Sequence, residues 1–289
     1  MKFDLIINNI FIILFQIFIS NQIILRKLDI SNEIILTIKG KGTQQIISSK
    51  YDIIPEEILV NGNSFQSNGK FVNGLIYEYN NITIKWNSPI TNCDYMFNGL
   101  NNIIKIDLSN FDSSCVTSMK EMFCGSESLI SLNLNNINTS NVNNMNKMFY
   151  GCIALTSLNL DSFKTSSVNN MELMFGSCKS LISLDLSYFN TSLVTTMNNM
   201  FSECESLETL DLNNFNTSNV NYMDFMFSGW INLMSLNINS FITSKIFNMD
   251  YMFYDCSKLI SLNLKNFNLV FKKNGIFNNI NKDLKYCII

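Results

Sequence analysis

A Met-Phe pair returns every 26 residues through most of this chain, and no insertion interrupts the spacing. The pair begins at Met96, Met122, Met148, Met174, Met200, Met226 and Met252. Self-similarity at a single period indicates an array of like units, each of which stacks on its neighbours. We therefore divide residues 91–270 into seven 26-residue units, numbered 1 to 7 in chain order.

The spacing of apolar residues changes once within each unit. With the Met as position 0, apolar residues occupy positions −6, −3, 0, +1 and +4, which share one face of a helix. A Leu-xx-Leu-x-Leu run follows, and its Leu-x-Leu step is the alternation of a short strand with one buried side. Each unit is thus predicted as a short helical segment, a loop, a short strand and a polar Thr-Ser turn. The Met and Phe side chains are expected to face inward and contact their copies in the next unit.

The Leu-xx-Leu-x-Leu core is the signature of leucine-rich repeats. The full unit, MFSECESLETLDLNNFNTSNVNYM at Met200–Met223, resembles the repeat of the BspA-like leucine-rich-repeat surface proteins. Asn81–Phe97 is similar to the lead-in of their eukaryotic members. The resemblance implies an α/β solenoid: a leucine-rich-repeat horseshoe with parallel strands on the concave face and short helical segments on the convex face. It also implies a secreted or surface-exposed protein, often adhesive or antigenic, with no enzymatic activity in the array.

The segments that flank the array have their own patterns. Residues 1–20 begin with Met1-Lys2 and continue as an apolar run, which is typical of a signal peptide, with an uncleaved N-terminal anchor or a buried N-terminal element as the alternatives. Residues 26–90 contain short β-branched runs between Gly, Asn and Ser clusters, and predict a small β-rich capping domain. Residues 271–289 predict a C-terminal cap with a short helix, because Ile276, Ile280 and Leu284 have helical spacing.

The composition excludes several classes of function. The chain has no His, which removes His-based triads, His metal ligands and the usual proton shuttle near neutral pH. A net charge of −3 gives no basic surface for nucleic acid. Residues 26–90 hold no clustered acid and base residues. We therefore expect no enzyme, no catalytic residue, no metal site and no cofactor.

Four cysteines share position +4 of their units: Cys152, Cys178, Cys204 and Cys256. In the other units this position holds Leu100, Ser126 and Trp230, so a disulfide framework does not follow from the pattern. We interpret the four thiols as small buried core filler. A bridge among cysteines outside this column stays open; these are Cys93, Cys115, Cys124 and Cys287.

The outward-facing strand residues are the candidate ligand-binding residues, because parallel strands hold side chains in a rigid grid. They are Asp107, Asn133, Asn159, Asp161, Asp185, Asp211, Asn237 and Asn263. Asp185 and Asp211 are expected one strand apart, where they could share a cation or meet a basic partner. The alternative is that these short side chains only solvate the sheet.

Asn-x-Ser/Thr sequons make four asparagines candidates for glycosylation: Asn81, Asn138, Asn190 and Asn216. The last three occupy the same turn position of their units and are expected to project from one edge.

Together these features predict a non-enzymatic secreted or cell-surface protein for recognition or adhesion. Its partner would be a protein or glycan bound through the concave face, with no nucleic acid, and with a membrane only if the N-terminal segment is retained. The chain itself would be a monomer or would associate weakly. Two alternatives are a structural spacer in a surface coat or matrix and an N-terminally anchored intracellular scaffold.

Overall fold

The computed structural model describes residues 32–264, 267 and 274–287. The leader predicted at residues 1–20 lies outside the described residues. The described part contains eleven β-strands and no helix. None of its segments is therefore a helix able to cross a membrane.

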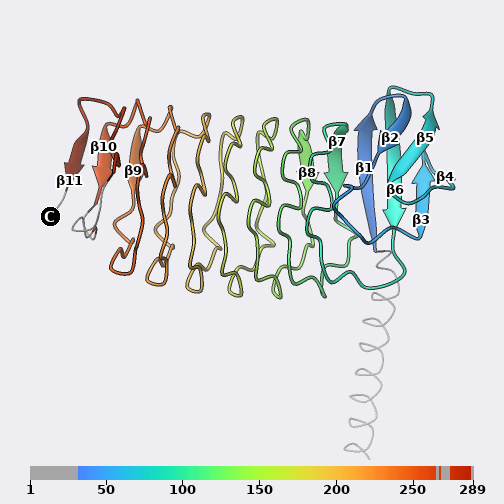
Figure 1. Cartoon of the computed structure of the whole chain (residues 1–289), viewed down its shortest axis with the longest axis horizontal. Helices are drawn as coiled ribbons and strands as arrows, with labels where there is room; N and C mark the ends of the chain where they lie inside the picture. The colour runs from blue at the N-terminus through green and yellow to red at the C-terminus, as the bar shows by residue number, and fades with distance from the viewer. Residues whose placement is uncertain (1–31, 265–266, 268–273, 288–289) are drawn as a thin grey trace, which may run out of the picture.

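An antiparallel β-structure precedes the repeat array (Figure 1). Along β1, the buried side chains Ile34, Leu36 and Ile38 alternate with more exposed ones, as expected for a strand with one face on the core. The main sheet has the order β4-β3-β6-β1-β7-β8, and a second sheet pairs β2 with β5. The strands before the array are β1 (Glu33–Lys39), β2 (Gly42–Gln45), β3 (Glu57–Val60), β4 (Asn63–Ser64), β5 (Phe71–Leu75) and β6 (Tyr79–Lys85).

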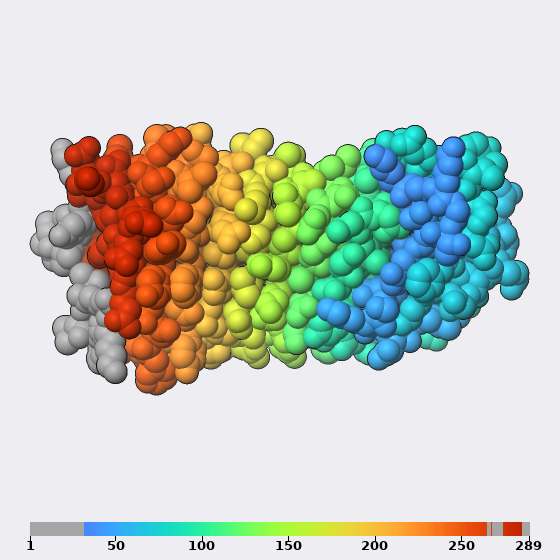
Figure 2. Space-filling view, turned by 45° about the horizontal axis from the view of Figure 1, so that its top comes forward, coloured from blue at the N-terminus to red at the C-terminus, as the bar shows by residue number. Residues whose placement is uncertain are grey.

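The cap and the array share one sheet. β1 pairs antiparallel with β7 (Ile103–Asp107), which is the strand of unit 1. β7 then pairs in parallel with β8 (Ser131–Asn133) of unit 2. The edge of the first unit is therefore covered by β1, and the space-filling view shows cap and array in direct contact (Figure 2).

The units stack along the long axis of the molecule (Figure 1). β9 (Ser235–Asn237) and β10 (Ser261–Asn263) pair in parallel with a 26-residue offset. β11 (Lys285–Cys287) adds to β10. The equivalent residues of units 3 to 5 are not in strands; they are residues 157–159, 183–185 and 209–211. We call the outward surface of these strands and their equivalents, positions +8 to +13, the strand face.

The opposite side of each unit, positions −5 to +3, contains the Met-Phe pair and is here called the turn wall. Parallel bridges link every successive pair of units there, from Asn92↔Ser118 to Tyr222↔Asn248. Alternate N–H groups donate to carbonyls of the next unit: in unit 1, Tyr95 to Lys120 at 2.9 Å and Phe97 to Met122 at 2.8 Å. The turn wall is thus a hydrogen-bonded ladder that runs through the array.

The turn wall also shows that the predicted helical segments are wrong. Position −1 has a positive φ, between 53° and 64°, in all seven units: Tyr95, Glu121, Lys147, Leu173, Asn199, Phe225 and Tyr251. A right-handed helix requires negative φ, so none can form across this position. Instead, consecutive tight turns carry the chain, such as Met96 N–H to Cys93 O at 3.2 Å. The fold is therefore not the α/β leucine-rich-repeat horseshoe that we expected; it is a helix-free stack of units.

The predicted contacts between Met-Phe copies are confirmed for the Phe side chains. The rings at position +1 are buried from Phe97 to Phe253, and each stacks on the next with centroids 5.5–5.9 Å apart. A second ladder includes Phe163–Phe189 at 6.3 Å and Phe215–Phe241 at 6.4 Å. Stacked aromatic pairs add about 0.5–1.5 kcal/mol each beyond the area they bury, so the ladders couple neighbouring units.

Position +4 supplies a buried hydrogen-bond donor to the preceding unit. The Cys178 thiol donates to Phe149 O at 3.1 Å, and Cys152, Cys204 and Cys256 make the equivalent contact. Ser126 donates to Phe97 O at 2.9 Å, while Trp230 Nε1 donates to Leu207 O. Leu100 needs no donor because no unit precedes it. The column is therefore buried as predicted, but it also satisfies backbone carbonyls.

The Thr of the Thr-Ser turn is buried and links neighbouring units. Thr165 Oγ1 donates to Asn190 O at 3.0 Å and accepts Asn190 N–H at 2.8 Å. Thr139, Thr191 and Thr217 repeat this two-way bond with the residue 25 positions later. The predicted polar turn is therefore a third line of contacts between units.

An eighth, offset unit replaces the predicted C-terminal helix. Phe277 stacks on Phe253 at 5.9 Å, and Phe253 N–H donates to Ile276 O at 3.1 Å, so Ile276-Phe277 takes the place of the Met-Phe pair. Gly275 and Asn279 have the positive φ of positions −1 and +3, at 61° and 57°. The helical spacing of Ile276 and Ile280 therefore arises from the same tight turns as in the other units.

Candidate functional site

The strand face presents the predicted polar column at position +11. Asp107, Asn133 and Asn263 are half-buried, and Asn159, Asp185, Asp211 and Asn237 are exposed. In six of these residues Oδ1 accepts the backbone N–H two residues later, at 2.8–3.3 Å. Such Asx turns fix the side chain, and in units 1, 2 and 6 they also end the strand. Asp161, at position +13, is exposed and supplies one of these N–H groups.

Hydrogen bonds favour the charged form of two of these carboxylates. The Ser187 backbone N–H lowers the pKa of Asp185 below its ordinary value. Partial burial acts to raise the pKa of Asp107, but hydrogen bonds from Ser109 and Asn133 outweigh it, and the net shift is downward. Asn133 Nδ2 lies 3.0 Å from Asp107 Oδ1. The column therefore carries fixed negative charge at neutral pH.

Asp185 and Asp211 occupy the same position of neighbouring units, but each directs Oδ1 at its own backbone. The described residues hold no group of three His, Cys, Asp or Glu side chains arranged for a metal ion. The arrangement thus offers repeated hydrogen-bonding groups without an evident chelating site.

A row of exposed aliphatic side chains that sequence reasoning missed lies three positions before the polar column: Ile130, Ile182, Met234 and Ile260. They occupy position +8, immediately after a buried Leu. The available signal was the Leu-Ile-Ser-Leu sequence, in which an apolar residue breaks the alternation of the strand. Thr156 and Glu208 interrupt the row. The strand face therefore combines fixed polar groups with apolar surface.

The sequons lie on the surface. Asn190 and Asn216 are exposed and Asn138 is half-buried, and each Oδ1 accepts the N–H of the sequon Ser. Asn81 is also exposed, in β6, where Thr37 Oγ1 donates to its Oδ1 at 3.2 Å. All four candidates remain predictions, because their modification depends on export.

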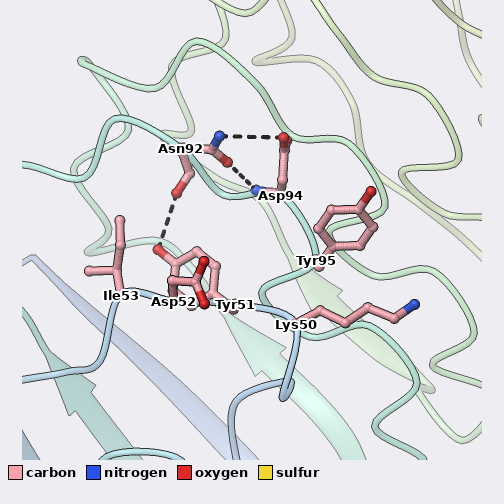
Figure 3. A pocket seen from close by; sticks show the side chains of 7 residues that line it. All are labelled: Lys50, Tyr51, Asp52, Ile53, Asn92, Asp94 and Tyr95. Carbon is pink, nitrogen blue, oxygen red and sulfur yellow. Dashed lines mark hydrogen bonds between the residues drawn. The ribbon is translucent and has the colours of Figure 1, made fainter.

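A separate polar cavity of about 340 Å³ lies between the cap and unit 1 (Figure 3). The cap contributes residues 50–53, and the first Met-Phe turn contributes Asn92, Asp94 and Tyr95. Tyr51 OH donates to Asn92 O at 3.1 Å, and the Asn92 side chain bonds both the N–H and the carboxylate of Asp94. Burial raises the pKa of the Tyr51 phenol. These bonds hold the junction together.

Two lysines lie over the Tyr95 ring beside this cavity. Lys50 Nζ and Lys120 Nζ each lie 5.4 Å from the centre of the Tyr95 ring, within the range of a cation–π contact. Asp94 Oδ1 accepts the Lys120 backbone N–H at 2.8 Å. Residues of the cap and of units 1 and 2 thus already contact one another around the cavity, and a structural role at the junction explains it.

Comparison with known proteins places the chain in a family. Neither a curated protein nor a solved structure matches it. A family model described as "Mycoplasma protein of unknown function, DUF285" matches residues 64–183 and 180–285. This match corrects the expected resemblance to BspA-like leucine-rich-repeat proteins, whose Leu-xx-Leu-x-Leu pattern occurs here in a helix-free unit. The chain belongs to the DUF285 family of Mycoplasma proteins of unknown function.

Proposed function

We propose that this protein is a non-enzymatic recognition or adhesion protein that binds an extended protein or glycan chain along its strand face. The observation that carries the proposal is the set of six identical Asx turns at position +11. They repeat one polar group in successive units, which suits a ligand that is itself repetitive or extended.

The fixed side chains favour binding because they lose little conformational entropy when a ligand binds. Immobilising a rotamer-rich side chain at an interface costs about 0.5–1.5 kcal/mol. The Asx turns remove most of that cost before the ligand arrives, since Oδ1 is already held by the backbone. Asp185 and Asn159 are exposed, so these two residues of the column are accessible to a ligand.

The aliphatic row supplies the apolar contact that the polar column lacks. Ile130, Ile182 and Ile260 are exposed three positions before it, and burying apolar surface contributes about 25 cal/mol per Å². Position +11 has no aromatic or Arg residue of the kind that dominates tight interfaces. Each unit is therefore a weak site, and useful affinity comes from engaging several units at once.

An extracellular location is part of the proposal. It is supported by the predicted signal peptide at residues 1–20 and by the three sequons that share one turn position, Asn138, Asn190 and Asn216.

The proposal is tested by screening the purified protein against immobilised peptides and oligosaccharides. We expect the combined variant Ile130→Ser, Ile182→Ser and Ile260→Ser to lose at least tenfold in apparent affinity for any ligand found. Asn143→Ser with Asn169→Ser, at exposed positions of the turn wall, is the matched control. Circular dichroism shows that each variant keeps its fold.

Two results would contradict the proposal. If the strand-face variant and the control bind equally well, the binding site does not lie on the strand face. The absence of binding to any probe, together with unchanged cell attachment of the variant, would favour a structural spacer.

A further inference from the structure

Aromatic side chains gather on the turn wall of units 6 and 7. Phe247 is 73% exposed and Tyr222 is 44% exposed, and their ring centroids lie 6.0 Å apart. Phe225 stacks on Tyr251 at 4.9 Å, and Tyr254 meets Tyr251 edge-on at 5.9 Å. We call these five residues the aromatic patch. Phe247 and Tyr222 are exposed, and Phe225, Tyr251 and Tyr254 are half-buried. Clustered aromatic surface marks an interaction site more often than a single exposed ring does.

The patch borders a hollow. A cavity of about 340 Å³ lies beside Phe247, lined also by Asn221, Ser244, Lys245 and Ile246. Lys245 Nζ is engaged at its rim, where it donates to Asn219 Oδ1 at 2.8 Å. The exposed Phe ring therefore forms the wall of a concave surface.

Acidic residues lie within the same two turns. Asp224 precedes Phe225, and Asp250 precedes Tyr251. Partial burial, together with the negative charges of Glu172 and Asp250, raises the pKa of Asp224. Burial is the largest cause of this upward shift and the two neighbouring carboxylates add to it, so a cation placed beside Asp224 would favour its ionised form.

Unit 1 shows what complements an Asp-aromatic pair at these positions. Asp94 and Tyr95 occupy positions −2 and −1, and the Tyr95 ring there has Lys50 and Lys120 each at 5.4 Å. Lys50 comes from the cap, and Lys120 comes from position −2 of the next unit. In unit 1, the chain therefore places two lysine ammonium groups beside the Asp-aromatic pair.

Among the described residues, units 6 and 7 repeat the acid and the ring without the cations. The counterparts of Lys120 are Asp250 for Phe225 and Asn274 for Tyr251, and Asn274 is bonded to Asp250. Among the described residues, no Lys or Arg is placed over either ring. The cap that provides Lys50 lies at the other end of the array (Figure 1).

We propose that the aromatic patch, with Asp224 and Asp250, binds a basic segment of a partner protein. One Lys or Arg side chain would lie over the Phe225–Tyr251 pair, as Lys50 and Lys120 lie over Tyr95. A second would reach Phe247 and Tyr222 at the cavity. The site lies on the turn wall, so it is independent of the strand face.

Charge separates this partner from a neutral glycan, the other usual occupant of exposed aromatic rings. A glycan would stack on Phe247 and Tyr222 but would leave the carboxylates unneutralised. A basic peptide satisfies both the rings and the acids.

The test uses the full chain and a fluorescently labelled hexalysine peptide, followed by anisotropy at low and physiological salt. We expect Phe247→Ser and Asp224→Asn each to weaken binding about three- to tenfold. Two controls are matched: Tyr188→Ser removes an equally exposed ring elsewhere (68% exposed), and Glu78→Gln removes one exposed negative charge on the cap.

Every outcome decides the proposal. Loss of affinity in the two patch variants with both controls unchanged supports it. No binding at low salt, or an equal loss with Glu78→Gln, overturns it. Binding of a neutral hexasaccharide that Phe247→Ser abolishes and Asp224→Asn leaves unchanged would also overturn it, by showing a glycan platform. None of these results depends on whether the strand-face variants retain their ligand.

Discussion

At the scale of single residues, position +4 shows how the array tolerates change. Cys, Ser and Trp all occur there, and each donates a hydrogen bond to a buried carbonyl of a preceding unit. The Cys column could be recognised as buried from the sequence, because its spacing places it on the apolar face. Its donor role could not, because the accepting carbonyl belongs to a residue 29 positions earlier.

We predict that Cys178→Ser preserves stability better than Cys178→Val, although Val is the more apolar replacement. Val leaves Phe149 O with only the Cys152 N–H, at 3.1 Å, and the loss of a typical hydrogen bond costs about 0.5–1.5 kcal/mol. The measurement is the free energy of unfolding in urea. A Val variant as stable as the Ser variant would show that the thiol is core filler alone.

The buried thiols also give stability a dependence on pH. Burial raises the pKa of the Cys178 and Cys256 thiols from 9.0 to about 12. Below pH 9 each thiol is protonated in both states, whereas between pH 9 and 12 only the unfolded chain releases the proton. We therefore expect the urea midpoint to fall as the pH rises above 9.

Cys178→Ser is the control for this pH effect, because a hydroxyl does not titrate in this range. Its midpoint should fall less steeply than that of the natural chain. Parallel slopes for the two proteins would rule out the buried thiol as the cause.

At the scale of the element, the 26-residue unit was recognisable but its backbone was not. A spacing of three or four residues between apolar side chains is compatible with a helix and equally with a series of tight turns, because both structures return side chains to one face. Position −1 holds Tyr, Glu, Lys, Leu, Asn or Phe, so no glycine signals the positive φ. The turn is imposed by hydrogen bonds to the next unit, which no local pattern reveals.

The aromatic ladder predicts different costs at its middle and at its end. Phe175→Ala should cost about 3–5 kcal/mol, because the ring is fully buried between Phe149 and Phe201. Phe277→Ala, in the offset eighth unit, should cost less and act locally. Limited proteolysis should then cut near residues 274–287 first. Equal global destabilisation by both would show that the terminal unit folds with the whole array.

At the scale of the whole molecule, β1 joins two structures that would each expose an edge alone. It pairs with β6 on one side and with β7 of the array on the other. The sequence predicted a β-rich segment before the array, but not that its strand completes the array's own sheet. That pairing spans about seventy residues, and strand propensity contains no information on partners so distant.

We predict that Thr37→Pro, in the middle of β1, destabilises the protein, because Pro removes a backbone donor from a strand that is paired on both sides. It should also increase self-association, because the freed edge of β7 can pair with another chain. Size-exclusion chromatography with light scattering measures the association. Thr83→Pro in β6, which does not contact β7, is the control for loss of stability alone. Equal self-association of the two variants would show that the exposed edge of β7 is not its cause.

The two long sides of the array differ in continuity, and this gives the molecule a preferred direction of bending. The turn wall is bridged at every step from Asn92 to Asn248, whereas units 3 to 5 have no strand pairing on the opposite side. We therefore expect the turn wall to resist bending more strongly than the strand face does. When the array is bent, we expect most of the deformation in units 3 to 5. The distances between neighbouring residues of the polar column should increase or decrease there. The strand face should therefore bind a curved or strained polymer with a different affinity from a relaxed one.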